Sequence, residues 1–78
     1  DEGLLIHQCN SIHTFFMAYP IDVIFLDRKE KVIKIIRNLK PWRMTFMYWK
    51  ANKVLELKAG TIPHELHEGS VIRKIEHV

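Results

Sequence analysis

Short runs of β-branched and aromatic residues, bounded by turn-forming residues, constrain the fold of this chain most strongly. Runs of this length and composition are typical of strands. They occupy residues 4–7, 15–17, 21–26, 32–37, 53–57 and 71–76. Residues 44–49 fit either a further strand or an irregular aromatic segment. The pattern therefore predicts a mainly β protein.

Two breaks show how these runs are connected. Pro20 forces Tyr19 toward extended geometry, which excludes a helix through this junction and leaves two short strands or one kinked strand. The polar residues 27–30 separate two apolar runs and predict the turn of a hairpin over residues 21–37. Lys53 to Leu57 alternates as a half-buried strand does.

One short helix is predicted within residues 61–67, because Thr61 is a suitable cap and Pro63 falls in a first turn. Gly69 follows as a terminator. No internal repeat or linker composition divides the chain. We therefore expect a single domain over residues 1–78, of β-rich α+β class, with a small antiparallel sheet curled toward a barrel and one short helix.

The composition is that of an ordinary globular protein. The 78 residues are 47% hydrophobic and 27% charged, and no apolar run is long enough to span a bilayer. Cys9 is the only cysteine, so an internal disulfide is excluded and a reducing compartment, the cytoplasm, is favoured. The opening DEGLL carries no targeting signal, and we expect the natural chain to start upstream of it.

Basic residues are concentrated in the middle of the chain. Residues 28–58 hold ten of the twelve Lys and Arg side chains against two acids. Within them, residues 39–50 interleave four Trp, Tyr and Phe rings with Lys and Arg, a pattern that suits single-stranded nucleic acid. The Lys and Arg residues are equally typical of solvated strand faces, and the aromatic rings of side chains that cover a small core. Nucleic-acid binding is therefore kept here as an alternative.

Several separated motifs occur together in a recognisable order. They are GLLI, CNSIHTFFM, PIDVIFLD, KVIKII, LKPWR, VLELKAGT and EGSVI, between residues 3 and 72. In this order they resemble the uncharacterised prokaryotic family known as domain of unknown function 192 (DUF192). The resemblance implies a compact β-rich domain and no established activity.

The chain departs from that family in two respects. Family members usually carry further strand sequence before GLLI, so the resemblance implies missing strands and an exposed sheet edge that invites pairing with a second copy as a homodimer. Glu30 stands where the family commonly has glycine in a D-x-x-G turn. We therefore expect either a positive φ at Glu30, at a cost of about 1 kcal/mol, or a different turn type.

A polar corner precedes the run at residues 21–26. Asp22 alternates onto an apolar face and needs a partner there, for which His13 is the natural candidate. Together with the Pro-Trp-Arg loop, this corner predicts a binding surface for a small polar or anionic ligand. The predicted ligand-binding residues are Asn10, His13, Asp22, Trp42 and Arg43.

An enzyme is the alternative from another class. Cys9, or Ser11, activated by His13 with Asp22 as orienting group, would form a hydrolase-type site, but no nucleophile motif surrounds these residues. His7, Cys9 and His13, with the distant pair His64 and His67, lack the paired spacing of a metal site. We therefore expect a binding or interaction module without metal or cofactor, rather than an enzyme.

Overall fold

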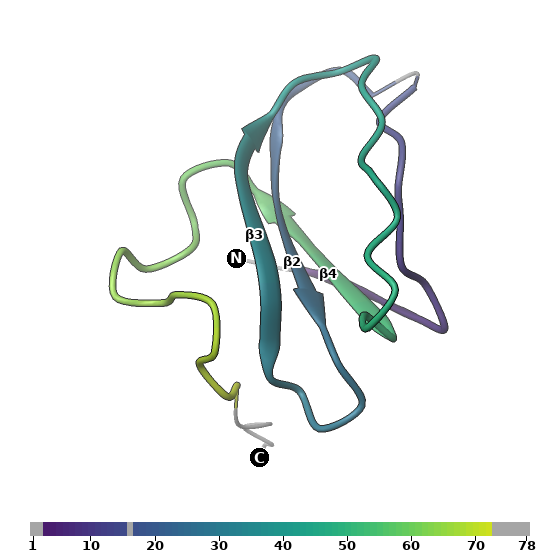
Figure 1. The fold of residues 1–78 in the computed structure, drawn as a ribbon. Coiled ribbons are helices and arrows are strands. Elements are labelled where there is room, and N and C mark those ends of the chain that lie inside the picture. The colour runs from purple at the N-terminus through teal and green to yellow at the C-terminus, as the bar shows by residue number, and fades with distance from the viewer. Residues whose placement is uncertain (1–2, 16, 73–78) are drawn as a thin grey trace.

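The computed structural model describes residues 3–15 and 17–72. Four strands form one antiparallel sheet in the order β1-β4-β2-β3 (Figure 1). They are β1 Leu4–His7, β2 Ile21–Leu26, β3 Val32–Leu39 and β4 Lys53–Lys58. The mainly β class is confirmed. Strands β2, β3 and β4 fall where the sequence predicts them, with β3 and β4 slightly longer, and β1 has the predicted bounds.

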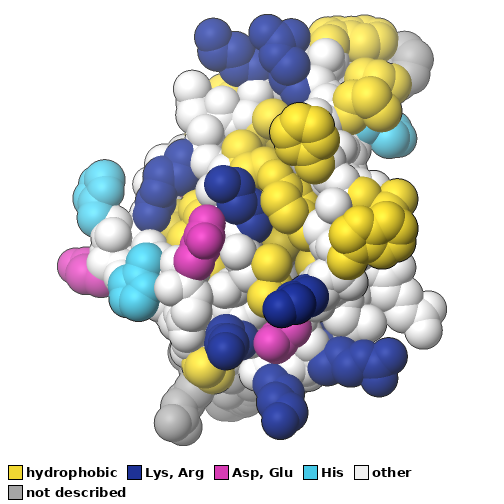
Figure 2. All heavy atoms as spheres, viewed as in Figure 1, with side chains coloured by type: hydrophobic (Ala, Val, Ile, Leu, Met, Phe, Trp, Pro, Cys, Tyr) yellow, Lys and Arg dark blue, Asp and Glu magenta, His cyan; other side chains and the backbone are white. Residues whose placement is uncertain are grey.

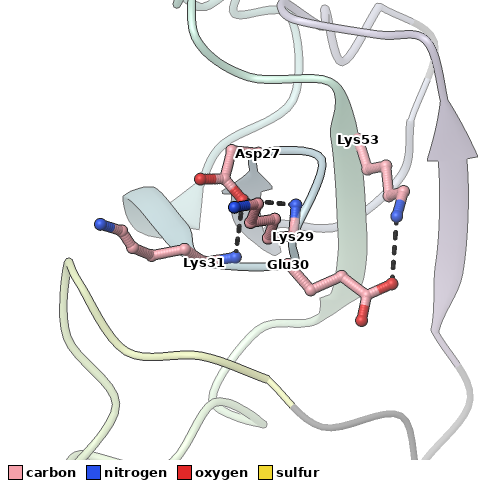
Figure 3. Close-up of polar contacts among 5 residues, drawn as sticks. All are labelled: Asp27, Lys29, Glu30, Lys31 and Lys53. Atoms are coloured by element: carbon pink, nitrogen blue, oxygen red, sulfur yellow. Dashed lines mark hydrogen bonds and ion pairs between the residues drawn. The ribbon is translucent and has the colours of Figure 1, made fainter.

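The predicted hairpin joins β2 to β3 through a tight turn. The Asp27 carboxylate accepts hydrogen bonds from the backbone amides of Lys29 and Lys31 at 2.8 and 2.9 Å, as Figure 3 shows. Glu30 has a φ of 64°, which confirms the predicted left-handed residue in this turn. Its carboxylate reaches the Lys53 Nζ on β4 at 3.0 Å, so the strained residue also ties the hairpin to the neighbouring strand.

The sheet is a middle layer with irregular chain packed on both faces. On one face Ile21, Val23 and Phe25 pack with Val54 beneath segments 8–17 and 41–52. On the other face lie Ile24, Leu26 and Val32, covered by segment 59–72 through Ile62 and Leu66. Every residue of β2 is buried because this strand is central and both of its faces are covered. This is why β2 lacks a polar face.

The sequence prediction was wrong on two points of architecture. The sheet stays open and does not curl into a barrel, because β1 and β3 lie at opposite edges and do not pair. Residues 61–67 form turns rather than a helix. The Arg37 guanidinium donates to the carbonyls of Ile62 and Pro63, both at 3.0 Å, and the Pro63 carbonyl also accepts from the Leu66 amide at 3.2 Å, which closes a tight turn.

Three remaining segments are irregular. Phe15 and Met17 are not in a strand, because the Met17 amide turns back to the Thr14 carbonyl at 3.3 Å. Residues 44–49 follow the irregular alternative, apart from a bridge between Met44 and His13. Val71 makes a single bridge to Lys31, and the rest of the predicted last strand, residues 73–76, lies outside the described residues.

Candidate functional site

A buried threonine joins the two segments that cover one face of the sheet. Thr14 is fully buried, and its hydroxyl donates to the Lys40 carbonyl at 2.7 Å and accepts from the Arg43 amide at 2.9 Å. Its own amide donates to the Arg43 carbonyl at 2.8 Å, and its carbonyl accepts from the Trp42 amide at 3.0 Å. Thr14 therefore fixes the backbone of residues 40–43.

The loop held by Thr14 carries Trp42 in a strained conformation. Trp42 has a φ of 63°, in the left-handed region, which costs roughly 1–2 kcal/mol for a residue with a Cβ atom. Four backbone and hydroxyl contacts of Thr14 on either side of it keep that conformation in place. Its indole remains 55% exposed, so packing against the core does not account for this strain.

Three rings form what we call the aromatic row: His13, Phe15 and Trp42. The His13 and Phe15 ring centroids are 4.8 Å apart, and those of Phe15 and Trp42 are 5.6 Å apart in a stacked arrangement. All three side chains are exposed, and the exposed Arg43 follows directly on Trp42. Figure 2 shows hydrophobic side chains gathered beside a histidine at the upper right of the molecule. The row thus offers ring surface to solvent beside a cation.

A carboxylate lies near the His13 end of the row. Glu56 on β4 is half-buried and lies on the same face of the sheet as Val54. Burial raises the pKa of the Glu56 carboxyl, and the positive charge of the nearby His13 lowers it. Glu56 lines a groove of about 550 Å³ together with Met17, Tyr19, Ile21 and Lys58. Glu56 therefore belongs to this groove and also interacts electrostatically with the His13 end of the aromatic row.

Replacing Glu56 by Gln is expected to stabilise the domain at pH 7. Because the folded-state pKa is raised, ionised Glu56 opposes folding above that pKa, and the penalty disappears as the pH falls through it. Urea unfolding of the wild type and the Gln variant from pH 4 to 8 measures the difference. A variant less stable at pH 7, or an advantage that grows on acidification, contradicts the assignment.

Asp22 lies away from the aromatic row, and the predicted pairing of His13 with Asp22 was wrong. The Asp22 side chain is on the face covered by segment 59–72, whereas segment 8–17, which carries His13, covers the other face. Its Oδ1 accepts from the Asn38 amide at 2.8 Å, and its Oδ2 accepts from the amides of Gly60 and Ile62 at 2.9 and 3.4 Å. Backbone amides are therefore its partners.

The other predicted site residues separate into two groups. His13 and Trp42 meet through Phe15, with Arg43 adjacent in the chain. Asn10 lies in the same segment as His13 but outside the aromatic row, and its backbone carbonyl accepts a hydrogen bond from the Tyr48 amide at 2.9 Å. Two of the five predicted residues thus come together around a ring that the sequence did not single out.

The hydrolase-type arrangement is not assembled. The Cys9 thiol donates to the Ser11 carbonyl at 3.1 Å and packs against the core cluster, while Asp22 points to the opposite face. Within residues 3–15 and 17–72, no group of three or more His, Cys, Asp or Glu side chains is placed to hold a metal ion. Cys9 and Asp22 thus lie on opposite faces of the sheet.

Sequence reasoning missed Thr14, Phe15 and Glu56. Glu56 had a usable signal, since it alternates with Val54 in residues 53–57 and so shares a strand face with a core residue. Phe15 was assigned to a strand, and Thr14 was not singled out. Their roles depend on the contact with residues 40–43, far away in the sequence, and no local pattern announces that contact.

Comparison with known families identifies the chain. The model of DUF192, described as "Uncharacterized ACR, COG1430", matches residues 1–74. The chain belongs to the DUF192 family. This confirms the resemblance seen in the sequence, and it assigns no activity to the DUF192 domain.

Curated relatives of this DUF192 chain carry the name UPF0127 protein. That of Thermococcus sibiricus is 41% identical over 54 residues, which are 69% of this chain and 34% of the relative. UPF0127 protein PH1112 of Pyrococcus horikoshii is 46% identical over 50 residues, or 64% of this chain and 43% of the relative. The chain therefore spans well under half the length of these relatives. No solved structure matches it significantly. In the part of the chain that the structure describes, no helix could cross a membrane.

Proposed function

We propose that this DUF192 domain is a binding module that accepts a small polar or anionic ligand on the aromatic row. The observation that carries the proposal is the exposed Trp42 held at a φ of 63° by a fully buried threonine. Backbone strain of this kind persists only where the surroundings over-determine it, and it is concentrated at ligand sites. A strained, solvent-exposed and stacked indole has no role in the core.

The core itself is filled by other rings and aliphatic side chains. Phe25 is fully buried, and its ring packs against that of Tyr48 with centroids 4.7 Å apart. The row therefore lies outside the buried core clusters, and its three rings are exposed to solvent. Thr14 and the stacked Phe15 hold the indole in one position before the ligand arrives, which reduces the entropy lost on binding.

The groups around the row define the class of ligand. A ring with a flat face, such as a sugar or a heteroaromatic ring, can stack on the Trp42 indole. The guanidinium of Arg43 supplies a cation for a carboxylate or phosphate on that ring. At the other end, Glu56 can accept hydrogen bonds from ligand hydroxyl or amine groups. A small ring compound with an anionic substituent satisfies all three groups.

The proposal is tested by NMR titration with sugars, sugar phosphates and aromatic carboxylates. We expect the first resonances to shift to be those of His13, Phe15 and Trp42, and we expect Trp42→Ala to weaken binding at least about tenfold, equivalent to about 1.4 kcal/mol. Trp42→Phe should keep most of the affinity. Phe46→Ala is the matched control, because Phe46 is 82% exposed in the same segment but outside the row.

Two results contradict this function. One is a ligand whose resonance shifts lie elsewhere on the domain. The other is binding that Trp42→Ala and Phe46→Ala weaken equally, since a general loss of apolar surface would then explain the effect. If no compound in the panel shifts these resonances, the row is structural.

A further inference from the structure

A second concave surface lies at the other end of the molecule from the aromatic row. It is a groove of about 640 Å³ beside the turn between β2 and β3, which is at the lower end of Figure 1. Its size is in the range of small-molecule sites in proteins. It is lined by residues of the turn, by residues 49–52 and by Val71. Three segments far apart in sequence thus build it.

Positive charge dominates this groove. Its cationic lining residues are Arg28, Lys29, Lys31 and Lys50. The ion pairs within residues 3–15 and 17–72 are Lys34 with Glu68 and Lys53 with Glu30, while Lys29 and Lys31 interact electrostatically with the nearby Asp27 carboxylate. Figure 2 shows Lys and Arg side chains gathered at this lower end of the molecule.

The acidic residue that lines the groove, Asp27, is already engaged in the turn. Its carboxylate accepts from the amides of Lys31 and Lys29, and these hydrogen bonds lower its pKa despite some desolvation. It therefore stays ionised and directed at the backbone of its own turn, as Figure 3 shows. The groove therefore carries four cations against one carboxylate, and its net charge is positive.

An exposed indole completes the groove. Trp49 is 82% exposed, although the residues on either side of it are anchored. The Tyr48 amide donates to the Asn10 carbonyl at 2.9 Å, and the Ala51 amide closes a turn onto the Tyr48 carbonyl at 2.8 Å. Ala51 itself is buried in the core cluster. The backbone under Trp49 is fixed while its ring lies in solvent beside Lys50.

We propose that this groove binds a nucleotide unit, with the phosphate among the lysines and Arg28 and the base stacked on Trp49. Guanidinium and ammonium groups are the usual phosphate ligands of side-chain sites, and base stacking on an exposed aromatic ring contributes binding without sequence preference. The unit is either a free nucleotide or part of a single strand. The residues differ from those of the aromatic row, so this inference is independent of the function proposed above.

The test uses adenosine monophosphate and a fluorescently labelled single-stranded DNA of twelve nucleotides, each titrated at 50 and 200 mM salt. We expect binding that weakens with salt, because phosphate contacts release counterions. Trp49→Ala and Lys50→Ala should each weaken binding about tenfold. The controls are Phe46→Ala, an aromatic ring of equal exposure outside the groove, and Lys34→Ala, a cation already paired with Glu68.

The outcomes divide clearly. Binding of both compounds with similar affinity assigns the groove to free nucleotides, and much tighter binding of the strand assigns it to single-stranded nucleic acid. Each supports the proposal if the groove variants lose more affinity than the controls. It is overturned if neither compound binds at 50 mM salt, if inorganic phosphate binds as tightly as the nucleotide, or if the groove and control variants behave alike.

Discussion

Replacing Asp22 by Ala is expected to lower the free energy of unfolding by about 3–5 kcal/mol, because it removes, at a buried position, the carboxylate that accepts from three backbone amides. The side chain is 1% exposed, and its two oxygens serve the amides of Asn38, Gly60 and Ile62. These amides belong to the end of β3 and to the start of the segment that covers one face. Asp22 therefore joins the sheet to its covering layer.

That loss is large relative to the whole domain. At roughly 0.05–0.15 kcal/mol per residue, a chain of 78 residues has a stability of roughly 4–12 kcal/mol. Urea unfolding followed by far-UV circular dichroism measures the change. Asp22→Asn, which keeps one acceptor oxygen, should fall between wild type and Asp22→Ala.

Asp27→Ala is the matched control for this prediction. Asp27 also accepts two backbone amides, at 2.8 and 2.9 Å, but it does so at an exposed turn where water can replace it. We expect a much smaller loss there. Equal losses for Asp22→Ala and Asp27→Ala would mean that burial of the Asp22 network contributes nothing.

Thr14→Val is expected to cost about 2–4 kcal/mol, because it removes a hydroxyl that both donates and accepts at a fully buried position. Valine has nearly the same shape, so cavity formation contributes little. The same change should release the strained Trp42, which we expect to see as faster hydrogen exchange at the Trp42 and Arg43 amides and as a shift of indole fluorescence.

Two further variants separate the hydroxyl from other causes. Thr14→Ser keeps the hydroxyl and should lose no more than about 1 kcal/mol, the transfer free energy of one methyl group. Thr45→Val removes a hydroxyl that makes one long-range bond, to the Ile12 amide at 3.0 Å, and should also cost less than Thr14→Val. Slow exchange of the Trp42 amide in Thr14→Val would contradict the role given to Thr14.

The strands could be predicted because each depends on a local pattern. The Ile, Val and Phe runs of β2 and β3, and the polar turn between them, specify the hairpin without reference to distant residues. The positive φ of Glu30 followed from the family turn in the same way. The failed helix shows the limit, because its cap and proline signals are local, whereas Arg37, more than twenty positions away, binds two carbonyls of the observed turns.

The candidate site was predicted only in part for the same reason. Trp42 and Arg43 were singled out from a local motif, and His13 from its place in a polar corner. Their proximity arises from the bridge between His13 and Met44, which brings together two irregular segments. Asp22 was paired with the wrong partner because the sequence does not tell which layer covers which face of the sheet.

The strand order β1-β4-β2-β3 also determines how the chain can fold. Only β2 and β3 are joined by a short turn. Strand β4 follows the 41–52 segment in the chain and pairs with β2. Strand β1 pairs with β4, from which it is distant in sequence. Strands that are distant in sequence pair late, because the entropy cost of closing the loop between them arises before their contacts can offset it. The hairpin is thus the natural nucleus, and both β4 and the segment carrying Thr14 dock onto it through contacts of similar separation in sequence.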